Sequence, residues 1–310
     1  MKIIFFGTHE FATTILQGLI DNGIFDIDLV ITQPDKPVGR KQELQPSPVK
    51  ILAEKYNLKV DQPSSLKTFD FKTLETFDLG VCAQYGLIIP EKILSAPKFG
   101  TLNVHTSLLP KYRGASPIQT ALINGETETG VTIMKMDAGM DTGPIILQKT
   151  VKIDPDDTYP ILDEKLAKIG IFTLLEAVPD YVSGKLIPQP QDNAEATTCK
   201  LLDREDGKID WSKSAGEIYN QYRGLTPWPG VWTTMDDLFP TLGENKRIKL
   251  LKIALGDKNL RSEDQKIKIE KDRIFINCNN SVIEILELQL EGSNAMDSRS
   301  FINGYKNYLK

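Results

Sequence analysis

One run of residues in this chain combines side chains that suit acyl transfer. His105 is one of only two histidines in 310 residues, Asn103 precedes it by two positions, and Asp141 follows in an Asp-Thr-Gly-Pro turn. An amide can donate to an oxyanion, an imidazole can donate or hold a proton, and a carboxylate can orient and charge the imidazole. Singly, each residue is more typical of a strand end, a turn or a cap. Together, the three predict a catalytic site.

The chemistry that these residues suit is transfer of a small acyl group to an amine. An amino-acid α-amine titrates near ~8, and esterification lowers this value, so much of the amine is free base at neutral pH. A protein nucleophile is therefore not needed. Cys82 is a poor candidate for that role because it lies in an apolar run and is interpreted as a core residue.

The elements that must position these residues alternate between strand and helix patterns. Short apolar runs predict strands over 2–6, 27–31, 77–82 and 101–104, and helical spacing predicts helices over 11–19 and 49–56. This alternation indicates an α/β fold, a doubly wound and mostly parallel Rossmann-like sheet. Ligands of such sheets bind beyond the carboxyl ends of the strands, where Gly7, Tyr85 and His105 are expected to lie.

The next segments are predicted as two strands, over 130–136 and 144–153, joined by the loop Asp137–Gly143 and followed by a helix over 157–178. The turn after the first strand, Gly7-Thr8-His9-Glu10, contains one glycine and lacks the G-x-G-x-x-G fingerprint. The chain also lacks a P-loop motif. NAD and ATP are therefore poor candidates for the ligand.

The C-terminal part is predicted to be a separate, β-rich domain. We expect a catalytic domain over 1–186, a polar linker over 187–204 and a small OB-like β-barrel over 205–310. Its predicted elements are helices over 214–223 and 298–309 and strands over 230–235, 248–254, 265–269, 273–277 and 281–289.

Composition restricts the class of protein. The net charge is −5, but residues 246–273 carry ten lysines and arginines among five acids, which indicates a solvated strand face or a polyanion contact. Three widely spaced cysteines form no metal motif, so no metal site is predicted. The N-terminal apolar run is too short for a signal peptide, and no run reaches membrane-spanning length. We expect a soluble, cytoplasmic protein without a membrane partner.

Two motifs resemble the formyltransferases that use 10-formyltetrahydrofolate. The first is Asn103-Val104-His105-x-Ser107-Leu108-Leu109-Pro110 with Tyr112-Arg113-Gly114; the second is Thr129-Gly130-Val131-Thr132-Ile133-Met134 leading to Asp141-Thr142-Gly143. The resemblance implies that Asn103, His105 and Asp141 form the catalytic triad. It also implies a folate site, formed by Ser107, Leu108, Leu109, Pro110, Val81, Cys82, Ala83, Tyr85 and Asp137, with many of its contacts made by backbone groups.

The long loop 32–50 resembles the branch of this family that formylates methionyl initiator tRNA. Its Pro-Asp-Lys-Pro, Gly-Arg and Pro-Ser-Pro-Val-Lys segments match that branch, and Lys36, Arg40 and Lys41 would contact the acceptor arm. Gln42-Glu43 stands where relatives often carry more lysine. The resemblance continues into the C-terminal domain, for which it implies a positive face for tRNA, and it implies a monomer. An amino-sugar formyltransferase is the alternative, since the catalytic motif is common to both.

Overall fold

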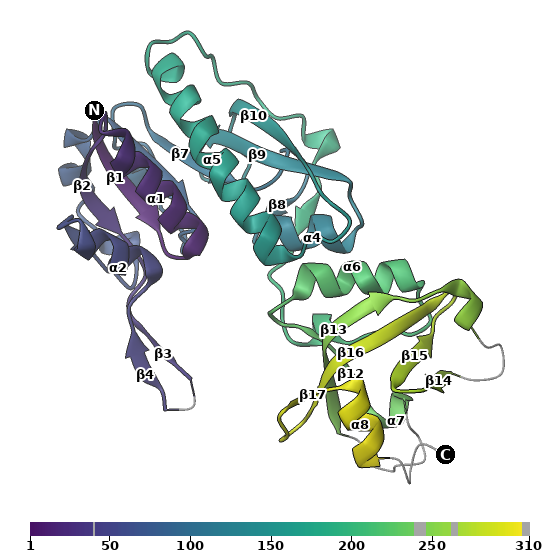
Figure 1. Cartoon of the computed structure of the whole chain (residues 1–310). Helices are drawn as coiled ribbons and strands as arrows, with labels where there is room; N and C mark the ends of the chain where they lie inside the picture. Colours follow the sequence, from purple (N-terminus) through teal and green to yellow (C-terminus); the bar gives the residue numbers. More distant parts are fainter. Residues whose placement is uncertain (40, 239–245, 262–265, 306–310) are drawn as a thin grey trace. The chain divides into compact units, whose positions relative to one another are not determined.

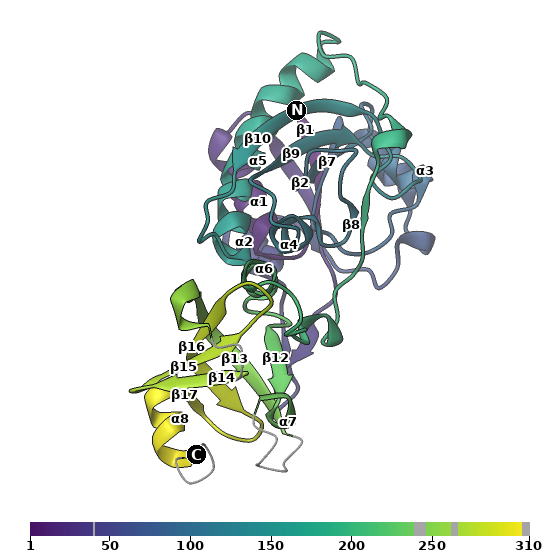
Figure 2. The same ribbon diagram turned by 90° about the vertical axis from the view of Figure 1, so that its right-hand side faces the viewer.

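The computed structural model describes residues 1–39, 41–238, 246–261 and 266–305, which form two compact units (Figures 1 and 2). The first unit comprises residues 1–117, 128–153 and 162–199. The second comprises 118–127, 154–161 and the chain from residue 200 onward. Each unit has its own sheet.

The first unit is built on a seven-stranded sheet in the order β10-β9-β7-β6-β1-β2-β5. Five neighbouring strands, β7 to β5 in this order, run parallel, whereas β9 is antiparallel to both β7 and β10. The strands are β1 (Lys2–Gly7), β2 (Asp26–Ile31), β5 (Val60–Asp61), β6 (Leu79–Ala83), β7 (Thr101–His105), β9 (Glu128–Lys135) and β10 (Ile145–Lys152). The mostly parallel sheet confirms the predicted α/β class.

Helices cover both faces of this sheet. On one face, α1 (Glu10–Asn22) packs against α5 (Tyr159–Val182), and α5 crosses β7 so closely that a Cβ on Gly170 would lie 3.0 Å from Val104. The other face packs Ile4, Phe6 and Cys82 beneath the 3₁₀ segments η1 (Leu66–Thr68) and η2 (Phe71–Thr76) and the short helix α3 (Glu91–Leu94). Helix α2 (Pro48–Lys55) also belongs to the first unit. Its N-cap is Ser47, whose side chain accepts a hydrogen bond from the Lys50 N–H.

Two short pairs of strands complete the first unit, one antiparallel and one parallel. Strands β3 (Lys36–Val38) and β4 (Glu43–Gln45) form a hairpin that projects from the body of the unit (Figure 1). Strand β8 (Arg113–Gly114) pairs with β11 (Thr198–Cys199), which brings the end of the unit's chain back to the loop after β7. The amino-acid pattern had indicated none of these four strands because each is only two or three residues long.

The second unit has an antiparallel sheet in the order β12-β13-β16-β15-β14, with β17 also paired to β16. Its strands are β12 (Val231–Thr234), β13 (Arg247–Leu255), β14 (Ile267–Glu270), β15 (Arg273–Asn277), β16 (Val282–Leu290) and β17 (Ala295–Asp297). Helices α6 (Ala215–Leu225), α7 (Met235–Leu238) and α8 (Ser298–Tyr305) accompany it, as does α4 (Pro117–Ile123), whose Ile123 packs on the same core. Within the described residues no pairing joins β12 to β14, so the antiparallel sheet is confirmed and a closed barrel is not found.

The predicted helices and strands of both halves are present, with ends shifted by a few residues. The final helix is described as far as Tyr305, and the last part of its predicted range lies outside the described residues. Among the described helices, none combines the length and apolarity that crossing a bilayer requires.

Candidate active site

Strand β7 presents the two polar residues of the first motif on one face of the sheet. Side chains alternate along a strand, so Asn103 and His105 point one way and Val104 points the other. Val104 meets Gly170 of α5, which places Asn103 and His105 on the opposite face from α1 and α5. Both residues are nearly buried, with exposed fractions of 8% and 5%. The alternation explains why the catalytic motif separates Asn and His by one residue.

Both ring nitrogens of His105 face oxygen atoms. Nε2 lies 3.1 Å from the carbonyl oxygen of Tyr112, and a carbonyl can only accept, so this hydrogen bond requires a proton on Nε2. Nδ1 lies 3.7 Å from Oδ1 of Asp141, which is within ion-pair range but longer than a hydrogen bond. Nδ1 is therefore the ring nitrogen that is less tightly engaged and can serve a reacting group.

Asp141 is held in a left-handed backbone conformation, with φ at +54°. Its Oδ2 accepts a 2.8 Å hydrogen bond from the backbone N–H of Gly114, while Oδ1 faces His105. Gly114 itself has φ at +122°, and a Cβ there would lie 2.2 Å from the carbonyl oxygen of Cys199. Only glycine allows β8 and β11 to approach this closely and still aim an N–H at the carboxylate.

The side-chain amide of Asn103 makes no hydrogen bond to any residue that the structure describes. The amide is not among the described side chains with a fully buried, unpartnered atom, so water or a ligand can reach it. An acceptor oxygen placed beyond the end of β7 would satisfy its N–H donors. The amide therefore fits a substrate carbonyl at this position.

The segment Ser107–Pro110 follows β7 directly and is fixed by two polar side chains. Thr132 Oγ1 donates to the Ser107 carbonyl oxygen at 2.6 Å and accepts from the Leu109 N–H at 3.1 Å. Gln148 donates to the Leu109 carbonyl oxygen at 2.9 Å. Leu108 packs against Gly130, where a Cβ would lie 2.5 Å from its side chain. The predicted folate segment is thus a rigid loop beside His105.

The other predicted folate residues occupy two different settings. Val81, Cys82 and Ala83 lie inside β6, paired with β1 and β7, and burial raises the pKa of the Cys82 thiol to about 12. Tyr85 is also buried; its ring meets Phe6 edge-on at 5.9 Å, its hydroxyl has no partner among the described residues, and burial raises its pKa to about 12.

Asp137, in contrast, is exposed at the start of the loop that carries Asp141. Its Oδ1 accepts hydrogen bonds from the Gly139 N–H and the Thr142 hydroxyl. These bonds close the loop from Asp137 to Thr142, the segment that contains Asp141.

The predicted tRNA residues lie apart from this centre, on the β3–β4 hairpin. Lys36 and Lys41 are exposed, and Arg40 lies outside the described residues. The base of the hairpin is fixed because Asp35 accepts from Lys50 at 2.9 and 3.0 Å and from Gln62 at 2.7 Å. The hairpin is therefore a basic projection on an anchored base.

Sequence reasoning assigned no role to two residues that support the catalytic loop, Gln191 directly and Arg113 through Gln191. The buried Arg113 donates to Gln191, and Gln191 donates to the carbonyl oxygens of Asp141 and Gly143. Arg113 was visible as part of the Tyr-Arg-Gly motif. Gln191 was not, because its Pro-rich, polar surroundings were interpreted as a linker.

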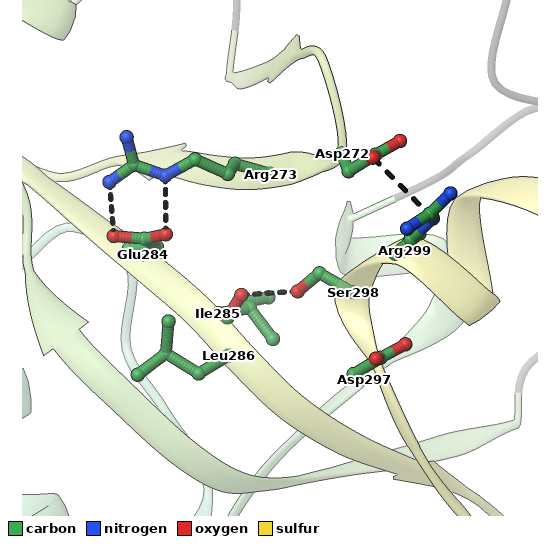
Figure 3. Close-up of a pocket in the computed structure, with 8 residues that line it drawn as sticks. All are labelled: Asp272, Arg273, Glu284, Ile285, Leu286, Asp297, Ser298 and Arg299. Carbon is green, nitrogen blue, oxygen red and sulfur yellow. Dashed lines mark hydrogen bonds and ion pairs between the residues drawn. The ribbon is translucent and has the colours of Figure 1, made fainter.

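The second unit has a pocket of its own, lined by residues of β15, β16 and α8 (Figure 3). Its two arginines are paired with acids: Arg273 makes two 2.7 Å bonds to Glu284, and Arg299 lies 3.5 Å from Asp272. Of the basic stretch, Arg247 also pairs with Glu205 and stacks on Trp232. These arginines are paired with acids of the same unit, whereas Lys249 and Lys252 of β13 are exposed.

The arrangement of Asn103, His105 and Asp141 in the first unit suits acyl transfer, and comparison with known proteins gives the family. Residues 1–178 match the formyl transferase family, and residues 201–306 match the formyl transferase C-terminal domain. The chain therefore belongs to the formyl transferase family.

Curated relatives cover the chain almost completely. It is 44% identical to the methionyl-tRNA formyltransferase of Caldicellulosiruptor saccharolyticus over 312 residues, which span 99% of this chain and 97% of the relative. It is 41% identical to that of Staphylococcus aureus over 315 residues, again spanning 99% and 97%. A solved N-formyltransferase from Helicobacter canadensis, in complex with folinic acid and dTDP-3-aminofucose, shares the fold with a TM-score of 0.67 and 20% identity, covering 92% of this chain and 98% of that one.

Proposed function

We propose that this protein transfers the formyl group of 10-formyltetrahydrofolate to the amino group of methionyl initiator tRNA. The observation that carries the proposal is the grouping of Asn103, His105 and Asp141 at the carboxyl end of β7, in a chain whose nearly full-length relatives are methionyl-tRNA formyltransferases. The exposed basic hairpin supports tRNA as the acceptor.

In this proposal the bound folate supplies the formyl group, and the residues of this chain prepare its transfer. The unpartnered amide of Asn103 donates to the carbonyl oxygen on which negative charge develops. Nδ1 of His105 accepts the proton that the attacking amine loses; the resulting Nδ1–H then donates to the oxyanion and passes the proton to the leaving nitrogen of the folate, while Nε2–H stays bonded to the carbonyl oxygen of Tyr112. Asp141 faces the ring at 3.7 Å from Nδ1 and fixes its orientation.

The folate co-substrate fits the polar groups that surround this centre. The fixed loop Ser107–Pro110 lies on one side of His105, and Asp137, Tyr85 and the strand Val81–Ala83 are assigned to the pterin side of the site. Because Val81 and Ala83 are fully buried, their part would be to fix the chain that leads to Gln84 and beyond. The buried Tyr85 hydroxyl, which lacks a partner among the described residues, is a candidate for a polar contact with the ligand.

We further propose that tRNA contacts two separate surfaces. Lys36, Arg40 and Lys41 would bind phosphates of the acceptor arm, and Lys249 and Lys252 on β13 would contact the backbone elsewhere. This assigns catalysis to residues 1–186 and tRNA binding to an OB-like domain over 205–310, joined by 187–204. The protein would act as a cytoplasmic monomer.

A formyl-transfer assay with two acceptors tests the proposal. Purified protein and 10-formyltetrahydrofolate are incubated with methionyl initiator tRNA or with a dTDP-amino sugar, and formylated product is measured by mass spectrometry. We expect formylmethionine on tRNA, with a rate that falls steeply as salt is raised. Formylation of the sugar without formylation of the tRNA would establish the alternative acceptor instead.

A further inference from the structure

A chain of hydrogen bonds connects the segment after α5 to the loop that carries Asp141. Gln191 Nε2 donates to the carbonyl oxygen of Asp141 at 2.8 Å and to that of Gly143 at 2.7 Å. Its Oε1 accepts from Arg113 Nε at 3.0 Å and from Arg113 Nη2 at 2.8 Å. One side-chain amide thus bridges a buried guanidinium and the backbone of the catalytic loop.

The partners of this amide fix its orientation. A guanidinium can only donate and a backbone carbonyl can only accept, so the Gln191 oxygen must face Arg113 and its nitrogen must face the loop. Both amide hydrogens and both lone pairs are used. A glutamate would lose the two donors, and a methionine of similar length would lose all four bonds. Of the residues with this reach, only glutamine satisfies both sides.

Arg113 is oriented in turn by a second amide. Its Nη2 donates to Asn193 Oδ1 at 2.8 Å, and its backbone N–H donates to the carbonyl oxygen of Thr197 at 2.9 Å. The next residue, Gly114, donates directly to the carboxylate of Asp141. The Arg113–Gly114 pair therefore holds Asp141 by its carboxylate, while Gln191 holds it by its carbonyl.

The hydrogen bonds to both the carboxylate and the carbonyl oxygen of Asp141 matter because this residue adopts φ +54°. A non-glycine residue avoids this backbone conformation without external support. The hydrogen bond between Asp137 and Thr142 closes the loop around Asp141, and Gly143 packs so tightly that a Cβ there would lie 1.8 Å from the carbonyl oxygen of Lys135. Gln191 bonds to the carbonyl oxygen of Asp141, inside this closed segment, and to that of Gly143, just beyond it.

We propose that Gln191 is a positioning residue for formyl transfer: presented by the segment 187–199 and oriented by Arg113, it holds Asp141 in the conformation that faces His105. This inference rests on the proposed function, since it assigns a role in that reaction. The segment is then part of the catalytic unit and constrains the catalytic aspartate.

The test is a double-mutant cycle with Asp141. In the wild-type background we expect Gln191→Met to lower kcat by roughly 10–100-fold, because a misplaced catalytic group acts like a partly deleted one. In an Asp141→Asn background the same substitution should cost less than about 3-fold, because it acts through the residue already altered. Equal losses in both backgrounds would show that Gln191 does not act through Asp141 and would overturn the proposal.

Gln189→Met is the matched control. Gln189 lies two residues away in the same segment, and among the described residues its side chain bonds only to the carbonyl oxygen of Ile187, at 3.0 Å. Its kcat should stay within about 2-fold of wild type, since surface substitutions have small effects. Gln191→Glu is a second variant that can keep its contact with Arg113 while losing both donors to the loop; a kcat equal to wild type would refute the proposal.

Histidine NMR supplies a readout that does not depend on turnover. The chain has only His9 and His105, so ring carbon–proton signals can be assigned by His9→Ala. Gln191→Met should move the His105 signals in the same direction as Asp141→Asn and leave those of His9 unchanged. Unmoved His105 signals would refute the inference. Absence of tRNA formylation by wild type would instead refute the proposed function, so the two failures are distinguishable.

Discussion

The loop around Asp141 and the β3–β4 hairpin, both in the first unit, differ in burial and in how they are bonded to the rest of the unit. The backbone carbonyl and one carboxylate oxygen of Asp141 are bonded to other parts of the chain, and His105, Asp141 and Gln191 are buried or half-buried. On the hairpin, all six strand residues are exposed, and the fixed contacts are confined to its base at Asp35. The first arrangement suits chemistry that requires accurate geometry, and the second suits binding to a large, charged partner.

The largest effect should come from removing the imidazole at the centre of the first region. We expect His105→Ala to lower kcat by roughly 10³-fold, because it removes both a proton carrier and an oxyanion donor. Single-turnover kinetics with methionyl-tRNA measures this loss. His9→Ala, at the start of α1 where the side chain makes no capping bond, is the control and should leave kcat within about 2-fold. Near-normal turnover by His105→Ala would remove His105 from the mechanism.

The next largest effect is expected from a substitution that prevents the close approach of the backbones of β8 and β11. Gly114→Ala would place a Cβ 2.2 Å from the Cys199 carbonyl oxygen and disturb the N–H that binds Asp141. We expect a loss of roughly 1–3 kcal/mol in the free energy of unfolding, together with a fall in kcat. Urea unfolding and initial rates measure the two effects.

Gly216→Ala provides the matched comparison, because a Cβ there meets nothing within 4 Å. Gly216 lies inside helix α6, where alanine is favoured over glycine, so this variant should be as stable as wild type or slightly more so. If both variants lost stability equally, the close approach of β8 and β11 would not be the cause.

A smaller and different effect is expected on the hairpin. Lys36→Ala combined with Lys41→Ala should lower kcat/KM for methionyl-tRNA by roughly 10-fold, because two phosphate contacts are lost. The slope of log(kcat/KM) against log salt concentration should become shallower by about one to two. The KM for folate should not change. Lys67→Ala removes one exposed charge elsewhere in the unit and serves as control. A matching rise in the folate KM would show that the hairpin supports the catalytic centre itself.

The smallest effect concerns a carboxyl group behind the catalytic region. Asp163 of α5 is half-buried, its one hydrogen bond to the described residues is a 3.4 Å contact from Gln84, and burial raises its pKa to about 6. Its pKa in the unfolded chain is about 4, so ionisation destabilises the folded state. The destabilisation develops as the pH rises through this interval and is complete above pH 6.

Asp163→Asn should therefore raise Tm by roughly 2–4 °C at pH 8, and this gain should disappear as the pH falls to about 4. Differential scanning fluorimetry across this range measures the effect. A gain that does not depend on pH would mean that packing, and not ionisation, limits stability at this position.

The sequence predicted those strands and helices whose apolar patterns extend over several residues. It predicted the position of the site from short motifs such as the one around His105. Buried parallel strands appear as apolar runs, so β1, β2, β6 and β7 were found, and with them the position of His105 at a strand end. The hairpin β3–β4 and the pair β8–β11 were missed, because strands of two or three residues carry no periodicity. The antiparallel sheet of the second unit was predicted, whereas its closure into a barrel is not found in the described chain.

By itself the sequence determined the family, and it predicted the reaction and the three residues expected to perform it, because these depend on residue types within two short motifs. Only the tertiary structure decided how those residues are held. Gln191 lies 50 positions from Asp141 and Arg113 lies 78 positions from Gln191, yet their hydrogen bonds meet at one loop. A local pattern cannot report such contacts, because hydrogen-bond geometry between distant segments exists only after the sheet has brought them together.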